Sequence, residues 1–249
     1  MKKVPVKIDF GGTVLSGDTI HADAGPQWLF LHGAGTSDRK RFEKLRVLLA
    51  QEGVGSCSFD FIGHGETKGS IIGSSLASRI AQTATLIDSG EVLQPLSVVA
   101  SSMSGYIAIK LAKQYEIENL VLIAPAVYAT RAHNALFGPA FTEAIRRPFS
   151  WRETDVWDIL QNYKGNLLIY EAEKDQIIPH EVIERIYDSA RNAKSREVVV
   201  VRDATHSLAK WLDERPDSLR AIVGKIRRLH HDSLEGQGKG STFIVELPI

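Results

Sequence analysis

The sequence has a single cysteine, no long apolar run and no excess of charge of either sign. Cys57 is the single cysteine of the 249 residues and cannot form an internal disulfide. This cysteine usage predicts a reducing compartment, the cytoplasm. No apolar run approaches the roughly 20 residues of a membrane span, and the charged segment 1–7 lacks the apolar stretch of a signal peptide. The 30 basic side chains balance the 30 acidic ones, which argues against electrostatic capture of nucleic acid.

The sequence also lacks the motifs of metal and nucleotide sites. The adjacent His230 and His231 do not have metal-site spacing, because neighbours on a helix point about 100° apart. The Gly-rich segment 236–248 resembles the last glycine loop and strand of histidine-kinase-type ATPase domains, but no helix follows it and nothing upstream supplies the rest of such a domain. We therefore expect no metal, no cofactor and no ATP binding, and we interpret 234–249 as a Gly-rich tail able to add one strand.

Apolar runs of strand type alternate with helical patterns along most of the chain. The strand-like runs lie at 28–31, 56–61, 96–99, 119–123, 166–171 and 197–201, after two short strands within 4–24 whose turns are expected at Gly11-Gly12 and Gly17-Asp18. The helical patterns lie at 39–51, 75–89, 106–115, 179–193 and 218–229. This alternation predicts an α/β fold with a doubly wound, mainly parallel sheet of about eight strands flanked by helices. The length suits one such domain, which we place at 1–233.

The segment 100–105, Ala-Ser-Ser-Met-Ser-Gly, joins a strand-like run to a helical pattern. A serine at the apex of such a turn needs small residues two positions away on each side, because the backbone doubles back there. Ser102 meets this condition with Ala100 and Ser104, whereas Ser101 and Ser104 would each have at least one bulky flank. The pattern predicts a nucleophile elbow with Ser102 at its apex; the alternative is a serine-rich strand end that opens an ordinary helix.

Two later strand ends carry the partners that a reactive serine requires. A serine hydroxyl is a weak nucleophile until a histidine takes its proton and a carboxylate holds that histidine in the right tautomer. Asp175 follows the apolar run 167–170 and His206 follows the run 198–201, so the order along the chain is serine, acid, histidine. The sequence therefore predicts the set Ser102, Asp175 and His206. Three other carboxylates are rivals for the acid: Glu171, Glu173 and Asp203.

A fourth feature is suited to stabilising negative charge. Attack on an ester places that charge on the carbonyl oxygen, and preorganised N–H donors stabilise it. The strand-like run 28–31 ends in His32-Gly33-Ala34-Gly35, where glycines let the backbone approach a substrate. We expect the backbone N–H groups of Ala34 and Met103 to form this oxyanion hole. A glycine turn after a strand is common in α/β folds, but four features in this order make coincidence a poor explanation.

These motifs together resemble the serine hydrolases of the α/β-hydrolase superfamily. The segments that carry the resemblance, spread over about 28–211, are 32–35, 60–65 (Asp-Phe-Ile-Gly-His-Gly), 100–105, 174–175 and 205–206. The resemblance implies the catalytic triad Ser102, Asp175 and His206 and the oxyanion hole of Ala34 and Met103. Within the superfamily the chain looks most like small esterases, monoacylglycerol-lipase-like enzymes and serine-aminopeptidase-like proteins. Its departure lies at the elbow, where Ala100 and Ser104 replace the usual glycines.

One interval breaks the alternation of strands and helices. In folds of this superfamily a cap is inserted at this place, so we interpret residues 126–163 as a small helical cap. Its aromatic side chains are suited to lining an apolar acyl pocket, and the alternative is that they attach the cap to the core. Polar groups of the neighbouring loops have structural interpretations: Asp60 and His64 hold their turn, and His32 shapes the glycine loop.

The resemblance implies a hydrolase acting on small molecules. We expect cleavage of carboxylic esters of small to medium acyl substrates through an acyl-enzyme on Ser102, without a cofactor, a nucleic acid partner or a membrane span. Thioesterase, lipase and C–C hydrolase activity would use the same triad and stay open as alternatives. A non-catalytic binding protein of the same fold is the alternative from another class. Epoxide hydrolases and dehalogenases of this fold need a carboxylate where Ser102 stands.

Overall fold

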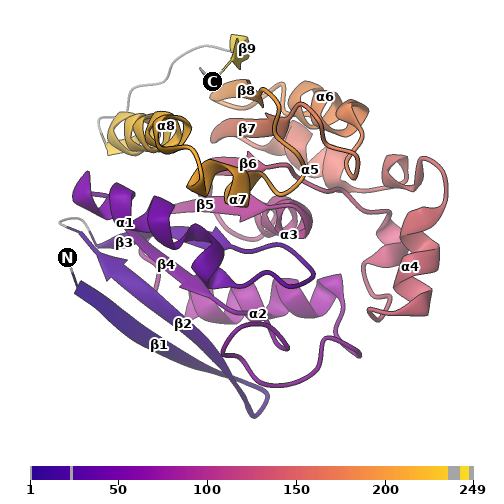
Figure 1. Cartoon of the computed structure of the whole chain (residues 1–249). Helices are drawn as coiled ribbons and strands as arrows, with labels where there is room; N and C mark the ends of the chain where they lie inside the picture. The colour runs from indigo at the N-terminus through magenta and orange to yellow at the C-terminus, as the bar shows by residue number, and fades with distance from the viewer. Residues whose placement is uncertain (1, 23–24, 235–241, 247–249) are drawn as a thin grey trace.

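The computed structural model describes residues 2–22, 25–234 and 242–246, and nine strands within them form one sheet (Figure 1). The strands are β1 (Lys2–Phe10), β2 (Thr13–His21), β3 (Pro26–Leu31), β4 (Gly55–Phe59), β5 (Leu96–Ser101), β6 (Ile117–Ile123), β7 (Asn166–Ala172), β8 (Ser195–Val201) and β9 (Thr242–Glu246). Their order is β1-β2-β4-β3-β5-β6-β7-β8-β9, and all neighbours are parallel except at β1 and β2. The predicted α/β fold with a mainly parallel sheet is confirmed.

Helices cover both faces of the sheet, because successive residues of each buried strand point to opposite sides. One face packs against α2 (Leu76–Asp88), α3 (Met103–Leu111), α5 (Val156–Asn162) and α6 (His180–Ser189). The other packs against α1 (Glu43–Gln51), α7 (Leu208–Asp213) and α8 (Pro216–Leu234). In β5, Val98 and Ala100 belong to the first core and Val99 to the second. No helix in the described ranges has the length and apolar character needed to cross a membrane.

The N-terminal hairpin corrects one expectation. Gly11 and Gly12 form its turn with positive φ angles of 57° and 82°, as expected. Gly17 and Asp18 were expected to form a second turn, but both lie inside β2. A Cβ at Gly17 would come within 2.6 Å of the Ser58 carbonyl oxygen on the paired strand, so this glycine marks a close approach of two strands.

Four charged residues around β2 form a cluster that we call the buried ion network: Asp18, Arg39, Arg46 and Asp60. Asp18 accepts from Arg46 Nη1 and Arg39 Nε, both at 2.7 Å, and Asp60 accepts from the Arg39 backbone N–H at 2.8 Å and from the Arg39 guanidinium. Arg39 opens η1 (Arg39–Phe42), so the network holds this helical turn against β2 and β4. Asp60 therefore has a structural environment, bonded to Arg39 and to neighbouring backbone.

The segment between β6 and β7 contains η2 (Thr130–Ala132), α4 (Pro139–Arg146), η3 (Ser150–Arg152) and α5. In Figure 1, α4 stands beyond the edge of the helical layer. The Phe137 and Phe141 rings pack edge to face with centroids 4.9 Å apart, and Phe141 lies 5.5 Å from the Tyr128 ring. Phe137 and Phe141 are buried in the core on the α2–α3 side of the sheet. These aromatics therefore attach α4 to the domain, and Tyr128 and Phe141 also face the cleft described below.

Candidate active site

Ser102 lies at the sharp turn between β5 and α3, with φ 50° and ψ −118°. A positive φ is costly for a residue with a side chain, and it persists only where surrounding contacts hold it. Here the Ser102 N–H donates to the Ile123 carbonyl at 3.0 Å, and the Ser102 carbonyl accepts from Gly105 and Ala126, both at 2.9 Å. A Cβ at Gly105 would come within 2.7 Å of the Pro125 side chain, so the helix can approach β6 this closely only with glycine there.

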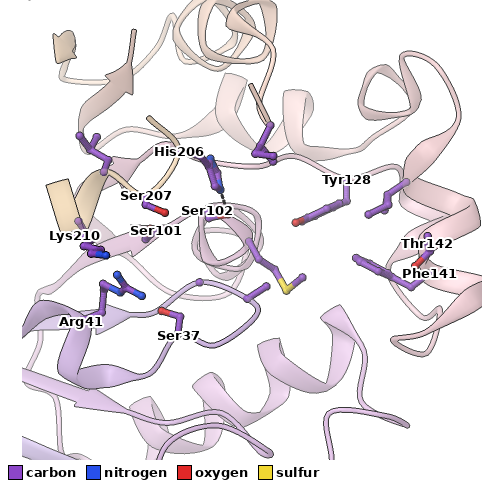
Figure 2. Close-up of a pocket in the computed structure, with 17 residues that line it drawn as sticks. Ser37, Arg41, Ser101, Ser102, Tyr128, Phe141, Thr142, His206, Ser207 and Lys210 are labelled. Carbon is purple, nitrogen blue, oxygen red and sulfur yellow. Dashed lines mark hydrogen bonds between the residues drawn. The ribbon is translucent and has the colours of Figure 1, made fainter. Parts of the chain in front are cut away.

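The structure brings together Ser102, His206 and Asp175 at the carboxyl ends of β5, β8 and β7. Ser102 Oγ lies 2.9 Å from His206 Nε2, and His206 Nδ1 lies 2.8 Å from Asp175 Oδ2 (Figure 2). A carboxylate can only accept, so His206 Nδ1 carries the hydrogen and donates it to Asp175. His206 Nε2 is then left to accept from the serine hydroxyl. The three side chains form a continuous line of hydrogen bonds that ends at the serine oxygen.

Asp175 is held as an ionised acceptor. Its other oxygen, Oδ1, accepts from the backbone N–H groups of Ile177 at 2.8 Å and Ile178 at 3.0 Å. Burial alone would raise the pKa of Asp175, but the hydrogen bonds from His206, Ile178 and Ile177 outweigh it and lower the pKa below its ordinary value. The side chain that orients the imidazole is therefore a carboxylate at neutral pH.

The three rival acids have other partners. Glu171 bonds to His180 Nδ1, Glu173 accepts from the Asp203 backbone N–H at 2.8 Å, and Asp203 pairs with Lys174. None of these three carboxylates bonds to His206 among the described residues, and the carboxylate that does is that of Asp175.

The two expected N–H donors of the oxyanion hole line the same cleft as Ser102. Met103 is the first residue of α3, so no carbonyl of the helix accepts its N–H. The Ala34 N–H lies in the glycine loop and donates no hydrogen bond to the residues that the structure describes. Both groups are thus available to a ligand beside the serine.

The glycine loop is fixed from two sides. The Ser104 hydroxyl donates to the His32 carbonyl, which joins the elbow helix to the start of the loop. The His32 ring donates from Nδ1 to the Gly33 carbonyl at 2.8 Å and accepts at Nε2 from the Phe61 N–H at 3.2 Å. Burial, reinforced by the neighbouring His64, lowers the pKa of His32 to about 3, so this ring is a neutral structural group. Sequence reasoning missed the bond of Ser104, although its signal was present as a hydroxyl in place of the usual glycine.

His64 is also fully engaged. Its Nδ1 donates to the Ser37 carbonyl at 2.9 Å, and its Nε2 accepts from Arg79 Nη2 at 2.6 Å. Both ring nitrogens therefore have partners, and the imidazole ties two loops and α2 together. Within residues 2–22, 25–234 and 242–246, no three His, Cys, Asp or Glu side chains are grouped as a metal site would need.

A cleft of about 440 Å³ opens above Ser102. Figure 2 shows two different halves on either side of the serine: aromatic side chains from the β6–β7 segment on one, and cationic side chains on the other. The first half includes Tyr128, Phe141, Thr142 and Ile145, and the second includes Ser37, Arg41, Ser207 and Lys210. Sequence reasoning missed the cationic half, because η1 and α7 are far apart in the chain and only the fold joins them.

Comparisons with known proteins bear on the family and the fold of this chain. Residues 26–152, half of the chain, match the family described as serine aminopeptidase, S33. No curated protein matches the chain by sequence.

Three solved structures illustrate the likeness of the fold. An esterase (EaEST) from Exiguobacterium antarcticum is 19% identical, with a TM-score of 0.69 over 90% of this chain and 100% of that one. The thioesterase domain from the curacin biosynthetic pathway is 18% identical, with a TM-score of 0.67 over 91% and 99%. A monoacylglycerol lipase from Paleococcus ferrophilus is 18% identical, with a TM-score of 0.65 over 86% and 99%. At these identities the likeness establishes a shared fold.

Proposed function

The chain belongs to the serine aminopeptidase S33 family of the α/β-hydrolase superfamily, and we propose that it hydrolyses carboxylic esters of small to medium acyl size through an acyl-enzyme on Ser102. The observation that carries the proposal is the line of hydrogen bonds from Ser102 Oγ through His206 to Asp175, at 2.9 and 2.8 Å. It ends in an open cleft beside the free N–H groups of Ala34 and Met103.

The geometry supports the following sequence of steps. Ser102 Oγ attacks the ester carbonyl carbon while His206 Nε2 takes the hydroxyl proton. The Ala34 and Met103 N–H groups stabilise the negative oxygen of the tetrahedral intermediate. The intermediate collapses, His206 gives its proton to the departing alkoxide, and the acyl group stays on Ser102. Water, deprotonated by His206, then releases the acid and restores the serine.

Asp175 stabilises the imidazolium that forms in both halves of the reaction. It remains a carboxylate throughout, because its hydrogen bonds from His206 and two backbone N–H groups lower its pKa. A protein that only binds ligands has no need for this line of three groups, so its presence favours catalysis over a non-catalytic binding role. The same steps with a thioester, a lipid ester or a C–C bond are alternatives that a substrate panel separates.

The test is labelling of Ser102 by a fluorophosphonate together with turnover of p-nitrophenyl esters of increasing acyl length. We expect stoichiometric labelling, mapped to the peptide that holds Ser102, and hydrolysis of the shorter esters. Ser102→Ala should abolish labelling and lower kcat by about 10³-fold or more while the thermal unfolding transition is kept. Ser101→Ala is the matched control, because this adjacent serine lines the same cleft but does not bond to His206. Normal activity of Ser102→Ala, or a lethal effect of Ser101→Ala, would overturn the proposal.

A further inference from the structure

Two cations on one side of the cleft form no ion pair with the residues that the structure describes. Arg41, on η1, and Lys210, on α7, line the same cavity as Ser102 and His206. Figure 2 shows both on the side of Ser102 opposite to Tyr128 and Phe141. Neither side chain forms an ion pair or a hydrogen bond with the described residues, so their charges are available to a ligand.

The neighbouring cations differ from Arg41 and Lys210, because each of them has an ion pair or a hydrogen bond. Arg39, on the same helical turn as Arg41, is saturated by the buried ion network and Glu66. Lys40 lies 3.6 Å from Glu66, and Lys44 donates to the Asp213 carbonyl at 2.9 Å.

Arg41 interacts electrostatically with the Asp213 carboxylate, but among the described residues no ion pair within 4.0 Å joins the two. Arg41 is half-buried at the cleft, so its guanidinium is partly withdrawn from water and interacts more strongly with a bound anion than an exposed one would. This end of the cleft therefore carries two positive charges that no ion pair of the described residues engages.

The opposite half of the cleft is lined mainly by aromatic and aliphatic side chains. Phe141 is buried, and Tyr128 and Ile145 are half-buried. The side chains of Phe141 and Ile145 are carbon throughout, and Tyr128 adds an aromatic ring whose hydroxyl lies on the side of Ser102 (Figure 2). A substrate that spans the serine would thus place one end against aromatic and aliphatic groups and the other near two cations. Guanidinium groups bind carboxylates and phosphates with paired hydrogen bonds, and a cleft of one sign of charge concentrates ligands of the opposite sign.

We propose that the ester substrates of this enzyme carry an anionic group that binds Arg41 and Lys210, with an apolar part in the half formed by Tyr128, Phe141 and Ile145. This inference rests on the proposed ester hydrolysis and names its substrate class. The anion belongs either to the acyl part or to the alcohol part of the ester. Both share the same chemistry at the cationic half, and the test separates them.

The test uses two pairs of esters that differ in one charge. For the acyl side the pair is p-nitrophenyl hydrogen adipate and its neutral methyl ester. For the alcohol side the pair is 4-(butanoyloxy)benzoate and its neutral methyl ester. In the wild type we expect the anionic member of one pair to have a kcat/KM at least about tenfold above its neutral partner, the range of a charge-assisted hydrogen bond.

Variants then assign the preference to residues. Arg41→Gln combined with Lys210→Gln should bring the anionic-to-neutral ratio of that pair close to one, mainly through KM, and Arg41→Glu should invert it. Lys113→Gln is the matched control, because this exposed lysine lies outside the cleft and removes the same charge. The preference of the wild type should also weaken as salt rises.

The outcomes distinguish the two proposals. Equal hydrolysis of the charged and neutral members of both pairs, unchanged by the double variant, would overturn the anion site while ester hydrolysis stands. A preference that Lys113→Gln removes as fully as the double variant would also overturn it, since net charge alone would then be the cause. No hydrolysis of any ester together with no fluorophosphonate labelling of Ser102 would overturn the proposed function and this inference with it.

Discussion

The buried ion network and the line of hydrogen bonds from Asp175 to Ser102 are built from the same kinds of bonds, but only the second reaches the cleft. In the buried ion network, Asp18 and Asp60 are surrounded by the guanidinium groups of Arg39 and Arg46 and by backbone N–H donors, away from the cleft. The line from Asp175 through His206 instead ends at the Ser102 hydroxyl, which faces the cleft. A closed network contributes to stability, whereas a line with one open end can move a proton onto and off a substrate. Each prediction below tests this difference.

The largest effect is expected from Asp175→Asn, which breaks the open line. The amide cannot hold the Nδ1–H tautomer of His206 or stabilise the imidazolium, so kcat/KM should fall by about 10³-fold or more. The free energy of unfolding should change much less. Asp203→Asn is the matched control, an exposed acid near His206 in sequence that pairs with Lys174. Ester hydrolysis and thermal unfolding of both variants test the assignment, and a greater loss of activity in Asp203→Asn would contradict it.

The converse is expected from Asp18→Ala, which breaks the closed network. Two buried guanidinium groups would lose their shared carboxylate, and we expect the free energy of unfolding to fall by about 3–5 kcal/mol. Glu66→Ala removes another partner of Arg39, but one whose side chain is 51% exposed, so the loss there should stay below about 1 kcal/mol. Urea unfolding measures both. Activity per folded molecule should stay near that of the wild type, and a selective loss of kcat in Asp18→Ala would break the comparison.

The buried ion network should also make the free energy of unfolding depend on pH. Burial alone would raise the pKa of Asp18, but Arg46 and Arg39 outweigh it and the native-state pKa is lowered. A lowered pKa contributes stability that is full above the unfolded-state value of about 3.9 and disappears as pH falls through the native-state value. The difference in unfolding free energy between wild type and Asp18→Asn should therefore be constant near neutrality and shrink below about pH 4. A difference that grows on acidification would contradict the assigned direction.

A smaller effect is expected from Ser104→Ala, where the elbow meets the glycine loop. Without the hydrogen bond to the His32 carbonyl, the loop that presents the Ala34 N–H should be less well held, and kcat should fall by about tenfold with KM little changed. Ser104→Gly removes the same hydroxyl and should behave alike. A change of stability with unchanged kcat in both variants would mean that Ser104 has only a structural role.

The smallest effect is expected from truncation after Ser233. The predicted catalytic motifs end at His206, and β9 is the last strand of the sheet, paired with β8. The Gly-rich segment 236–241 lies outside the described residues. We expect most ester hydrolysis to remain, with no binding of ATP before or after truncation and a modest decrease in melting temperature. Gel filtration and activity measure this. Insoluble protein, or a changed molecular size, would show that β9 is required at this edge.

Much of the fold and of the candidate site was predictable because its signals are local. Buried parallel strands appear as continuous apolar runs, so the strands from β3 to β8 are visible in the sequence. The small residues around Ser102 reflect a backbone turn only a few residues long. The short helix α7, with six residues, gave too little periodicity to be recognised. Gly17 was mistaken for a turn because a glycine looks the same whether it bends the chain or admits a neighbouring strand.

The sequence by itself determined the alternation of strands and helices, the apex serine, and the order in which its acid and histidine follow. Only the tertiary structure decided which of four carboxylates meets His206, since all four lie near the ends of neighbouring strands and differ in their partners. It also decided that Arg41 and Lys210, 169 residues apart, share one cleft while Arg39 is neutralised in the interior. The physical reason is that hydrogen bonds and charge compensation depend on distances between segments, which periodicity along the chain does not encode.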